Sequence, residues 1–337
     1  MPKHRTSLKD LAQELGVSIA TVSRALHSSP EIGQEMQKRV KDLAKKLNYR
    51  PNPFAQSLRK EAPKVIGVVV PNLVTHYYAA VLDGIENEAR HAGYSVISAN
   101  THENFEDEQR VVDNFINLHV VGIIACLTQS TTDYRHFEEL HTMGIPLVFF
   151  GRTCLPELFS SVTANGDEAA QEATQHLIDT GSRRIAFIGG PNHLDMVRRR
   201  KHGYLEALRE NRIPVDRELV MCDSIDFEVA QRNTIQLLQH PDRPDAILAF
   251  NDILLFAALS AIKQLELRIP EDVALIGFTD DVHAGYTTPR LSAIEDQSFR
   301  MGQVACQQLL RHIGGDTKVR KEIVPQKLVI RETSARH

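Results

Sequence analysis

The sequence predicts an all-α head of the helix-turn-helix type, followed by a two-lobed α/β domain with parallel sheets. Three observations predict this fold class. Residues 6–48 show helical patterns only, and from residue 64 short apolar runs alternate with amphipathic helical stretches. The alternation restarts after residue 183, which indicates two similar halves. The 337 residues, 42% apolar and 24% charged, suit two or three core-forming domains and exclude a mainly disordered, collagen-like or coiled-coil chain.

Charge is divided unevenly along the chain. The formal net charge is -4, but residues 1–60 contain 12 basic and 5 acidic side chains, a net charge of +7. The remaining residues therefore have a net charge of -11. A basic head on an acidic body is the asymmetry expected when only the head meets a polyanion.

The cysteines and the N-terminal residues indicate the cellular compartment in which the protein is expected. The four cysteines, Cys126, Cys154, Cys222 and Cys306, are scattered and form no C-x-x-C pair. Residues 1–15 contain no apolar run of a signal peptide, and the apolar stretch 253–262 is too short to span a bilayer. We expect a cytoplasmic protein with reduced thiols and no metal site.

The first predicted helix begins after Ser7 and ends at Gly16. Its apolar face consists of Leu8, Leu11, Ala12 and Leu15. Ser7, with Asp10 three residues later, is typical of a capping box. Gly16 accepts the left-handed conformation in which helices end.

A second helix follows at once, capped by Ser18, and a third helix is expected further along the chain. Val22 and Leu26 face inward in the second helix, and Met36, Val40, Leu43 and Leu47 form one stripe in the third. Two helices joined by a turn at Gly16 match a helix-turn-helix, whose second helix enters the major groove of DNA. Spacing alone equally fits a structural three-helix bundle with a solvated basic face.

Residues 51–61 are expected to form a short hinge. Asn52 is a candidate N-cap, Pro53 suits the first helical turn, and the helix ends near Lys60. So short a helix is marginal in water and becomes ordered when it packs on a partner. Leu58 would then act as an apolar wedge in the minor groove. An ordinary linker whose Leu58 packs on a lobe fits the residues equally well.

The body is expected to form two α/β lobes, at about residues 64–160 and 161–290, with residues 291–330 crossing back between them. Its strand candidates are KVIGVVVP, YSVISAN, VVGIIAC, PLVFFG, RRIAFIGG, DAILAFND, VALIGFTD and KLVIRET. In such domains a ligand cleft lies at the carboxyl ends of the strands.

These residues resemble the lactose/galactose-repressor (LacI/GalR) family. The resemblance covers essentially the whole chain, including TSLKDLAQELGVSIATVSRALHSSPEIGQEMQKRVKDLAKKLNYRPNPFAQSLR, IGVVVPNLVTHYYAAVLDGIENEARHAGY, HLIDTGSRRIAFIGG, LAFNDILLFAALSAI and PEDVALIGFTD. It implies a dimeric transcription factor with a DNA-binding domain (1–50), a hinge helix and linker (51–61), and a periplasmic-binding-protein-like effector and dimerisation domain (62–337).

The resemblance also implies site residues. On the DNA-binding side these are Ser18, Ile19, Ala20, Thr21, Ser23 and Arg24 in the second helix and Asn52, Ala55 and Leu58 in the hinge. Ile19, Ala20 and Arg24 fall on base-reading positions, and Leu58 on the leucine that enters the centre of the operator. A guanidinium such as that of Arg24 pairs bidentately with guanine.

A small-molecule effector, a sugar or a sugar derivative, is expected in the cleft. The positions that match the family's effector site are Tyr77, Tyr78, Arg152, Arg200, Asn251, Asp252, Thr279 and Asp280. Each has a structural alternative. The tyrosines would pack a helix start, Arg200 would lie on a solvated face of the RRRK run, and Asn251 with Asp252 would cap the following helix.

Two of these positions depart from the family pattern. Gly151-Arg152 follows a strand after which the family often has an aspartate, and Thr279 stands where the family often has another acid. Losing two acids while keeping nearby arginines predicts a more positive cleft and hence an anionic effector, a sugar acid or a sugar phosphate. The alternative is a neutral carbohydrate whose carboxylate partner is Asp280 or Asp281.

The predicted function is therefore an effector-controlled regulator, expected to be a repressor, that binds a palindromic operator as a dimer. The chain has no leucine heptad after the last strand, so tetramers are not expected. A sugar kinase with a regulatory head would need a nucleotide site, and no such motif is present, so we expect no enzyme and no cofactor. A transport-type binding protein would need export, but residues 1–15 contain no signal peptide and the head is basic, so we do not expect this class.

Overall fold

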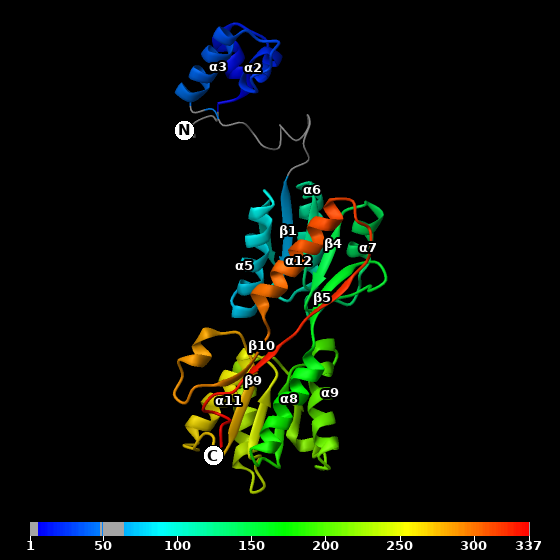
Figure 1. Cartoon of the computed structure of the whole chain (residues 1–337), viewed down its shortest axis with the longest axis vertical. Coiled ribbons are helices and arrows are strands. Elements are labelled where there is room, and N and C mark those ends of the chain that lie inside the picture. Colours follow the sequence, from blue (N-terminus) through cyan, green and yellow to red (C-terminus); the bar gives the residue numbers. More distant parts are fainter. Residues whose placement is uncertain (1–5, 48, 50–63, 337) are drawn as a thin grey trace. The chain divides into compact units, whose positions relative to one another are not determined.

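The computed structural model describes residues 6–47, 49 and 64–336 (Figure 1). The chain divides into two compact units, Met1–Pro63 and Lys64–His337. The described residues of each unit enclose hydrophobic cores of their own. The hinge positions Asn52, Ala55 and Leu58 lie outside the described residues, so the predictions made for them stay predictions.

The described part of the head contains three helices, α1 (Leu8–Leu15), α2 (Ile19–Leu26) and α3 (Gln34–Lys46). The predicted capping box is confirmed, since Ser7 Oγ accepts the backbone N–H of Asp10 and Asp10 Oδ2 accepts the N–H of Ser7. Gly16 ends α1 with a φ of 67°. Leu11, Val22 and Val40 are fully buried, so the three helices share one core.

The first lobe of the body is built on a six-stranded sheet. Its order is β11 (Lys321–Val324), β5 (Ser160–Ala164), β4 (Leu147–Phe150), β3 (Gly122–Ala125), β1 (Val65–Val70) and β2 (Ser95–Asn100), all parallel. One core includes residues of α5 (His76–His91) and α12 (Ser298–Ile313), the other residues of α6 (Phe105–Asn117) and α7 (Arg135–Thr142). The helices therefore cover both faces, as parallel sheets require.

The second lobe has a matching sheet. Its order is β12 (Lys327–Val329), β10 (Ser292–Glu295), β9 (Ala274–Phe278), β8 (Ala246–Ala249), β6 (Ile185–Gly189) and β7 (Val220–Cys222). The helices of this lobe are α8 (Gly166–Asp179), α9 (Asp195–Glu210), α10 (Phe227–Gln239) and α11 (Asp252–Gln264), with the 3-10 turns η1 (Arg217–Leu219) and η2 (Val282–Gly285). Their apolar residues and those of the sheet form a single cluster.

The chain crosses between the lobes three times. It leaves the first sheet after β5, returns after β10 to form α12 and β11, and crosses again to β12 (Figure 1). The predicted return of residues 291–330 between the lobes is confirmed. The predicted parallel sheets are confirmed, with one exception at an edge, where β12 runs antiparallel to β10. Among the described helices, none is long and apolar enough to cross a membrane.

Candidate functional site

Of the positions in and before α2 that are expected to face DNA, three are exposed (Ser18, Ile19 and Arg24) and three are half-buried (Ala20, Thr21 and Ser23). Ser18 caps the helix by accepting the backbone N–H of Thr21 at 3.0 Å, which fixes where α2 begins. Ile19, one residue further on, is 47% exposed. A single exposed aliphatic side chain is common on protein surfaces, and Ile19 matters here because the N-terminal turn of the second helix is the part of a helix-turn-helix that meets base edges.

Arg24 already has a partner within the head. Its Nη1 lies 2.9 Å from Glu31 Oε2, and both side chains are more than half exposed. An exposed ion pair of this kind contributes about 0–1 kcal/mol, so a guanine or a phosphate can replace Glu31 at little cost. His27 ends α2, and its Nδ1 lies 2.7 Å from the carbonyl oxygen of Ser23, so its contact in the structure is a local one.

In the body, one cavity lies at the carboxyl ends of the strands and between the two lobes. The structure brings all eight cleft positions of the sequence analysis to its lining: Tyr77, Tyr78, Arg152, Arg200, Asn251, Asp252, Thr279 and Asp280. The positions come from β1–α5, β4, α9, β8–α11 and β9, which are far apart in sequence. The cavity has a volume of about 160 Å³, smaller than the ~300–1,000 Å³ of typical ligand pockets, and it adjoins a second cavity of about 570 Å³.

The first-lobe wall depends on two tyrosines at the start of α5. The rings of Tyr77 and Tyr78 meet edge to face, 5.0 Å apart. Gly151 makes room for Tyr77, because a Cβ there would lie 2.9 Å from the Tyr77 hydroxyl, and its φ of +63° also favours glycine. Burial raises the pKa of both tyrosines well above the ordinary value, so both hydroxyls stay protonated.

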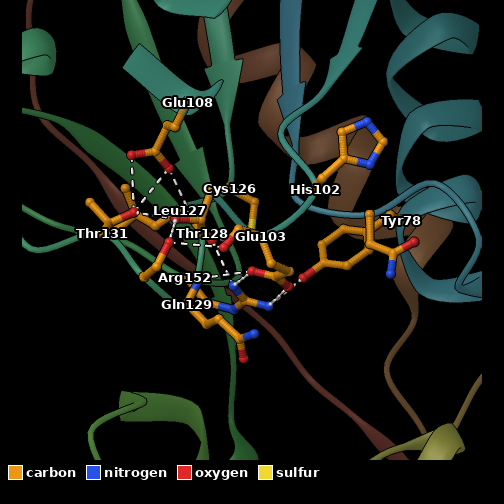
Figure 2. A network of polar contacts seen from close by, with 12 residues as sticks. Tyr78, His102, Glu103, Glu108, Cys126, Leu127, Thr128, Gln129, Thr131 and Arg152 are labelled. Carbon is orange, nitrogen blue, oxygen red and sulfur yellow. Dashed lines mark hydrogen bonds and ion pairs between the residues drawn. The ribbon is translucent and has the colours of Figure 1, made fainter. Parts of the chain in front are cut away.

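Arg152 forms a closed network with its neighbours (Figure 2). Its two Nη atoms contact the two carboxylate oxygens of Glu103 at 2.7 and 2.6 Å, the carbonyl oxygen of Leu127 at 2.8 Å and the hydroxyl of Tyr78 at 2.8 Å. Burial alone would lower the pKa of Arg152, but the hydrogen bonds and negative charge of Glu103 oppose this and keep the pKa above its ordinary value. Arg152 is therefore a fixed cation with its counter-ion attached.

Arg200 is buried rather than on a solvated helix face. It is 3% exposed and lies 3.7 Å over the ring of Phe278. Its Nη2 contacts Asp296 Oδ1 at 2.6 Å, and its Nη1 donates to the carbonyl oxygen of Phe250. Burial lowers the pKa of Arg200 and raises that of Asp296 to about 6, against the opposing attraction within the pair. Among the described atoms, the buried Nε of Arg200 has no hydrogen-bond partner.

The second-lobe positions have structural tasks as well. Asn251 caps α11 by accepting the N–H of Leu254 at 3.1 Å, the structural alternative that the sequence left open. Thr279 Oγ1 accepts the N–H of Asp281 at 2.9 Å. Each of these polar side chains still lines the cavity, so capping and ligand contact are compatible at both places.

Asp280 forms hydrogen bonds from one lobe to the other. It follows β9 of the second sheet, yet its carboxylate accepts the N–H of Gln297 at 3.2 Å and that of Ser298 at 2.6 Å. Ser298 begins α12, whose body packs against α5 in the first lobe. Asp280 thus caps a helix of the other lobe, a role that the sequence analysis did not foresee.

The expected excess of positive charge is wrong for this cavity. Two arginines line it, Arg152 and Arg200, together with four carboxylates, those of Glu103, Asp252, Asp280 and Asp296. Each arginine is paired with one of these carboxylates. The neighbouring Arg198 and Arg199 line an adjoining cavity that shares Arg152 and Arg200 with this one. Both lie beside Asp195 with side chains 55% and 43% exposed. The charges of the first cavity therefore do not support the anionic effector, which stays a prediction.

Sequence reasoning missed Glu103, Gln129 and Asp296 in the lining. Glu103 and Gln129 follow the carboxyl ends of β2 and β3, so the same strand-end rule that found Asn251 would have found them. Asp296 follows β10, a strand that was not predicted. Gln129 also links the lobes, since its carbonyl oxygen lies 3.1 Å from Nε2 of His193 in the second lobe.

Two family models match the chain. Residues 7–52 match the model of bacterial regulatory proteins of the lacI family, and residues 174–334 match a periplasmic binding protein-like domain. The first match covers the three helices of the head, and the second covers most of the second lobe with the returns between the lobes.

Similar whole proteins are found as well. The ribose operon repressor of Bacillus subtilis is 34% identical over 304 residues, 90% of each chain. The protein named probable HTH-type transcriptional repressor ExuR, also of Bacillus subtilis, is 31% identical over 98% of each chain. The solved structure of a complex of the transcriptional regulator CelR with cellobiose superimposes with a TM-score of 0.74 at 27% identity, covering 98% of this chain and 100% of that one.

Proposed function

The chain belongs to the LacI family of bacterial regulatory proteins, and from that premise we propose that it is a repressor that reads operator DNA with α2 and senses a small compound in the cavity between its lobes. Both relatives named above are repressors. The observation that carries the proposal is the exposed N-terminal turn of α2, with Ile19 47% exposed on a basic head.

DNA reading is assigned to Ser18, Ile19, Ala20, Thr21, Ser23 and Arg24. The N-terminal residues of the second helix contact base edges in this motif, and the basic side chains of α3 neutralise phosphates. The hinge segment 51–61, with Asn52, Ala55 and Leu58, is proposed to contact the minor groove. Two protomers on one duplex give a palindromic operator, because a two-fold protein reads two equal half-sites.

Effector binding is assigned to the cavity and its eight lining positions. The complex of CelR with cellobiose is the precedent for a sugar in a similar chain. Hydroxyl, amide, carboxylate and guanidinium groups converge there with the rings of Tyr77 and Phe278, which suits a small polyhydroxy compound. We assign no catalytic step to the cavity, because the relatives named above are regulators.

The test of DNA reading is a selection of bound duplexes from a random pool, followed by gel shifts at several salt concentrations. We expect a palindromic site whose affinity falls as salt rises. Arg24→Ala should cost about 1–3 kcal/mol at one base pair of that site. Glu31→Gln is the matched control, because it removes the ion pair and keeps the guanidinium. Equal affinity for all duplexes at moderate salt would refute the proposal.

A further inference from the structure

We propose that Glu103 sets the charge specificity of the cavity: by holding Arg152 in an ion pair, it makes the cavity accept uncharged polyhydroxy compounds and reject anionic ones. The inference rests on the proposed function, because it names the class of effector that the cavity takes. It also gives a role to a residue that lies outside the family positions carried over from the sequence.

Arg152 has almost no donor capacity left for a ligand. A guanidinium has five N–H donors. Four of them are directed at Glu103 Oε1, Glu103 Oε2, the carbonyl oxygen of Leu127 and the hydroxyl of Tyr78, at 2.6–2.8 Å. Only the Nε–H is left for a further acceptor. A phosphate or a carboxylate needs two parallel N–H groups for a bidentate contact, and it would have to displace Glu103 to obtain them.

Glu103 is held firmly in this position. His102 and Glu103 both have positive φ angles, 51° and 57°, which is unusual for side chains of this size. The backbone N–H of Glu103 donates to the carbonyl oxygen of Pro71 at 3.1 Å, and that of Gln129 donates to Glu103 Oε2 at 2.7 Å (Figure 2). Displacing the carboxylate from Arg152 would therefore also break the contact that positions the loop after β3.

The other charges of the cavity act in the same direction. Arg200 is paired with Asp296, and Asp252 and Asp280 add two further carboxylates to the lining. The side chains of Arg152 and Glu103 are only 15% and 23% exposed, so water screens the pair weakly. An anionic ligand would meet uncompensated negative charge, whereas hydroxyl groups can donate to these carboxylates.

The experiment is calorimetric titration of the full chain with two matched pairs, D-galactose against D-galacturonate and D-ribose against D-ribose 5-phosphate. In wild type, any binding should favour the neutral member. Glu103→Gln removes the counter-ion of Arg152 and should raise the affinity for at least one anionic member by about tenfold, the size of one hydrogen bond to a charged group. Glu106→Gln, which removes an exposed carboxylate of α6, should give no such gain.

Three results would overturn the inference. One is tighter binding of an anionic member than of its neutral partner by wild type. Another is no gain for either anion in Glu103→Gln. The third is a gain that persists in the double variant Glu103→Gln with Arg152→Met, since the anion must act through the guanidinium.

If Glu103→Gln does not fold, the variant Arg152→Met provides the test of the inference. The inference expects wild type and Arg152→Met to be equally unresponsive to galacturonate and ribose 5-phosphate. Loss of an anion response in Arg152→Met would mean that Arg152 grips anions, and the inference would be wrong. Gel shifts on the same preparations distinguish a failure of the proposed function from a failure of this inference. If the protein shows no preference among DNA sequences, the proposed function is wrong, but the preference of the cavity for neutral or anionic compounds can still be measured.

Discussion

At the scale of single residues, Asp296 gives the cavity a pH-dependent group. Burial raises its pKa to about 6, against the attraction of Arg200. A group whose pKa rises on folding stabilises the fold below its unfolded-state pKa and loses that contribution as the pH rises through the folded-state value. We therefore expect the contribution of Asp296 to the free energy of unfolding to decline between about pH 4 and pH 6.

The measurement is denaturant unfolding of wild type and Asp296→Asn across this range. The free energy of unfolding of wild type, relative to that of the variant, should fall as the pH rises from 4 to 6. Asp113→Asn, which removes an exposed carboxylate of α6, controls for the change in net charge. A difference between wild type and Asp296→Asn that rises over the same range would contradict the assignment.

At the residue scale, the sequence predicted which positions line the cavity but not how their side chains pair. All eight positions that the family resemblance implied line one cavity. The sequence did not predict the counter-ion of Arg152, which is Glu103, 49 positions earlier in the chain and in a turn of unusual backbone conformation. The pairing of carboxylates with arginines depends on how side chains of separate loops pack together. Local sequence patterns therefore do not predict it.

At the scale of elements, the close crossing of α5 and α12 holds the first-lobe wall in place. A Cβ at Gly302 would lie 2.0 Å from the carbonyl oxygen of Val81, and one at Gly84 would lie 2.1 Å from that of Phe299. The two helix backbones therefore touch reciprocally. Because α5 begins with Tyr77 and Tyr78, any separation of the helices would move the tyrosines of the cavity.

Gly302→Ala should therefore destabilise the body. Within a free helix this change would gain about 1 kcal/mol, so a loss of about 3 kcal/mol in the free energy of unfolding would show that the clash dominates. Gly285→Ala is the matched control, because no described atom lies within 4 Å of its added Cβ and its φ is not in the left-handed region. Equal stability of the two variants would mean that the helices shift apart without cost.

Elements also differ in how well they could be predicted. The eight predicted strands are apolar runs and all of them exist, although β2 is largely exposed at the edge of its sheet. Strands β5, β7, β10 and β11 were not predicted, because SSVTA, VMC, SAIE and KEIV are short or polar and lack an apolar run. Their places are set by long-range pairing, as between β11 and β5.

At the scale of the whole molecule, the proposed function requires DNA binding and effector binding to be linked. Linkage is reciprocal, so the factor by which an effector changes operator affinity equals the factor by which the operator changes effector affinity. Asp280, which joins β9 to the start of α12, and Gln129, which contacts His193, are the contacts between lobes through which a ligand in the cavity would act. A ligand that binds open and closed lobes equally would change nothing.

Leu58→Ala tests the connection between the two units. If Leu58 wedges into the minor groove, the variant should lose about 2 kcal/mol of specific operator affinity, because unstacking is no longer compensated by the inserted side chain. It should leave the affinity of the DNA-free protein for a neutral sugar unchanged, since the described lining of the cavity runs from Asn72 to Asp296. Gel shifts on the selected operator and calorimetry without DNA measure the two quantities. Unchanged operator affinity would assign Leu58 to a linker, and a parallel loss of sugar affinity would place it in the packing of the body.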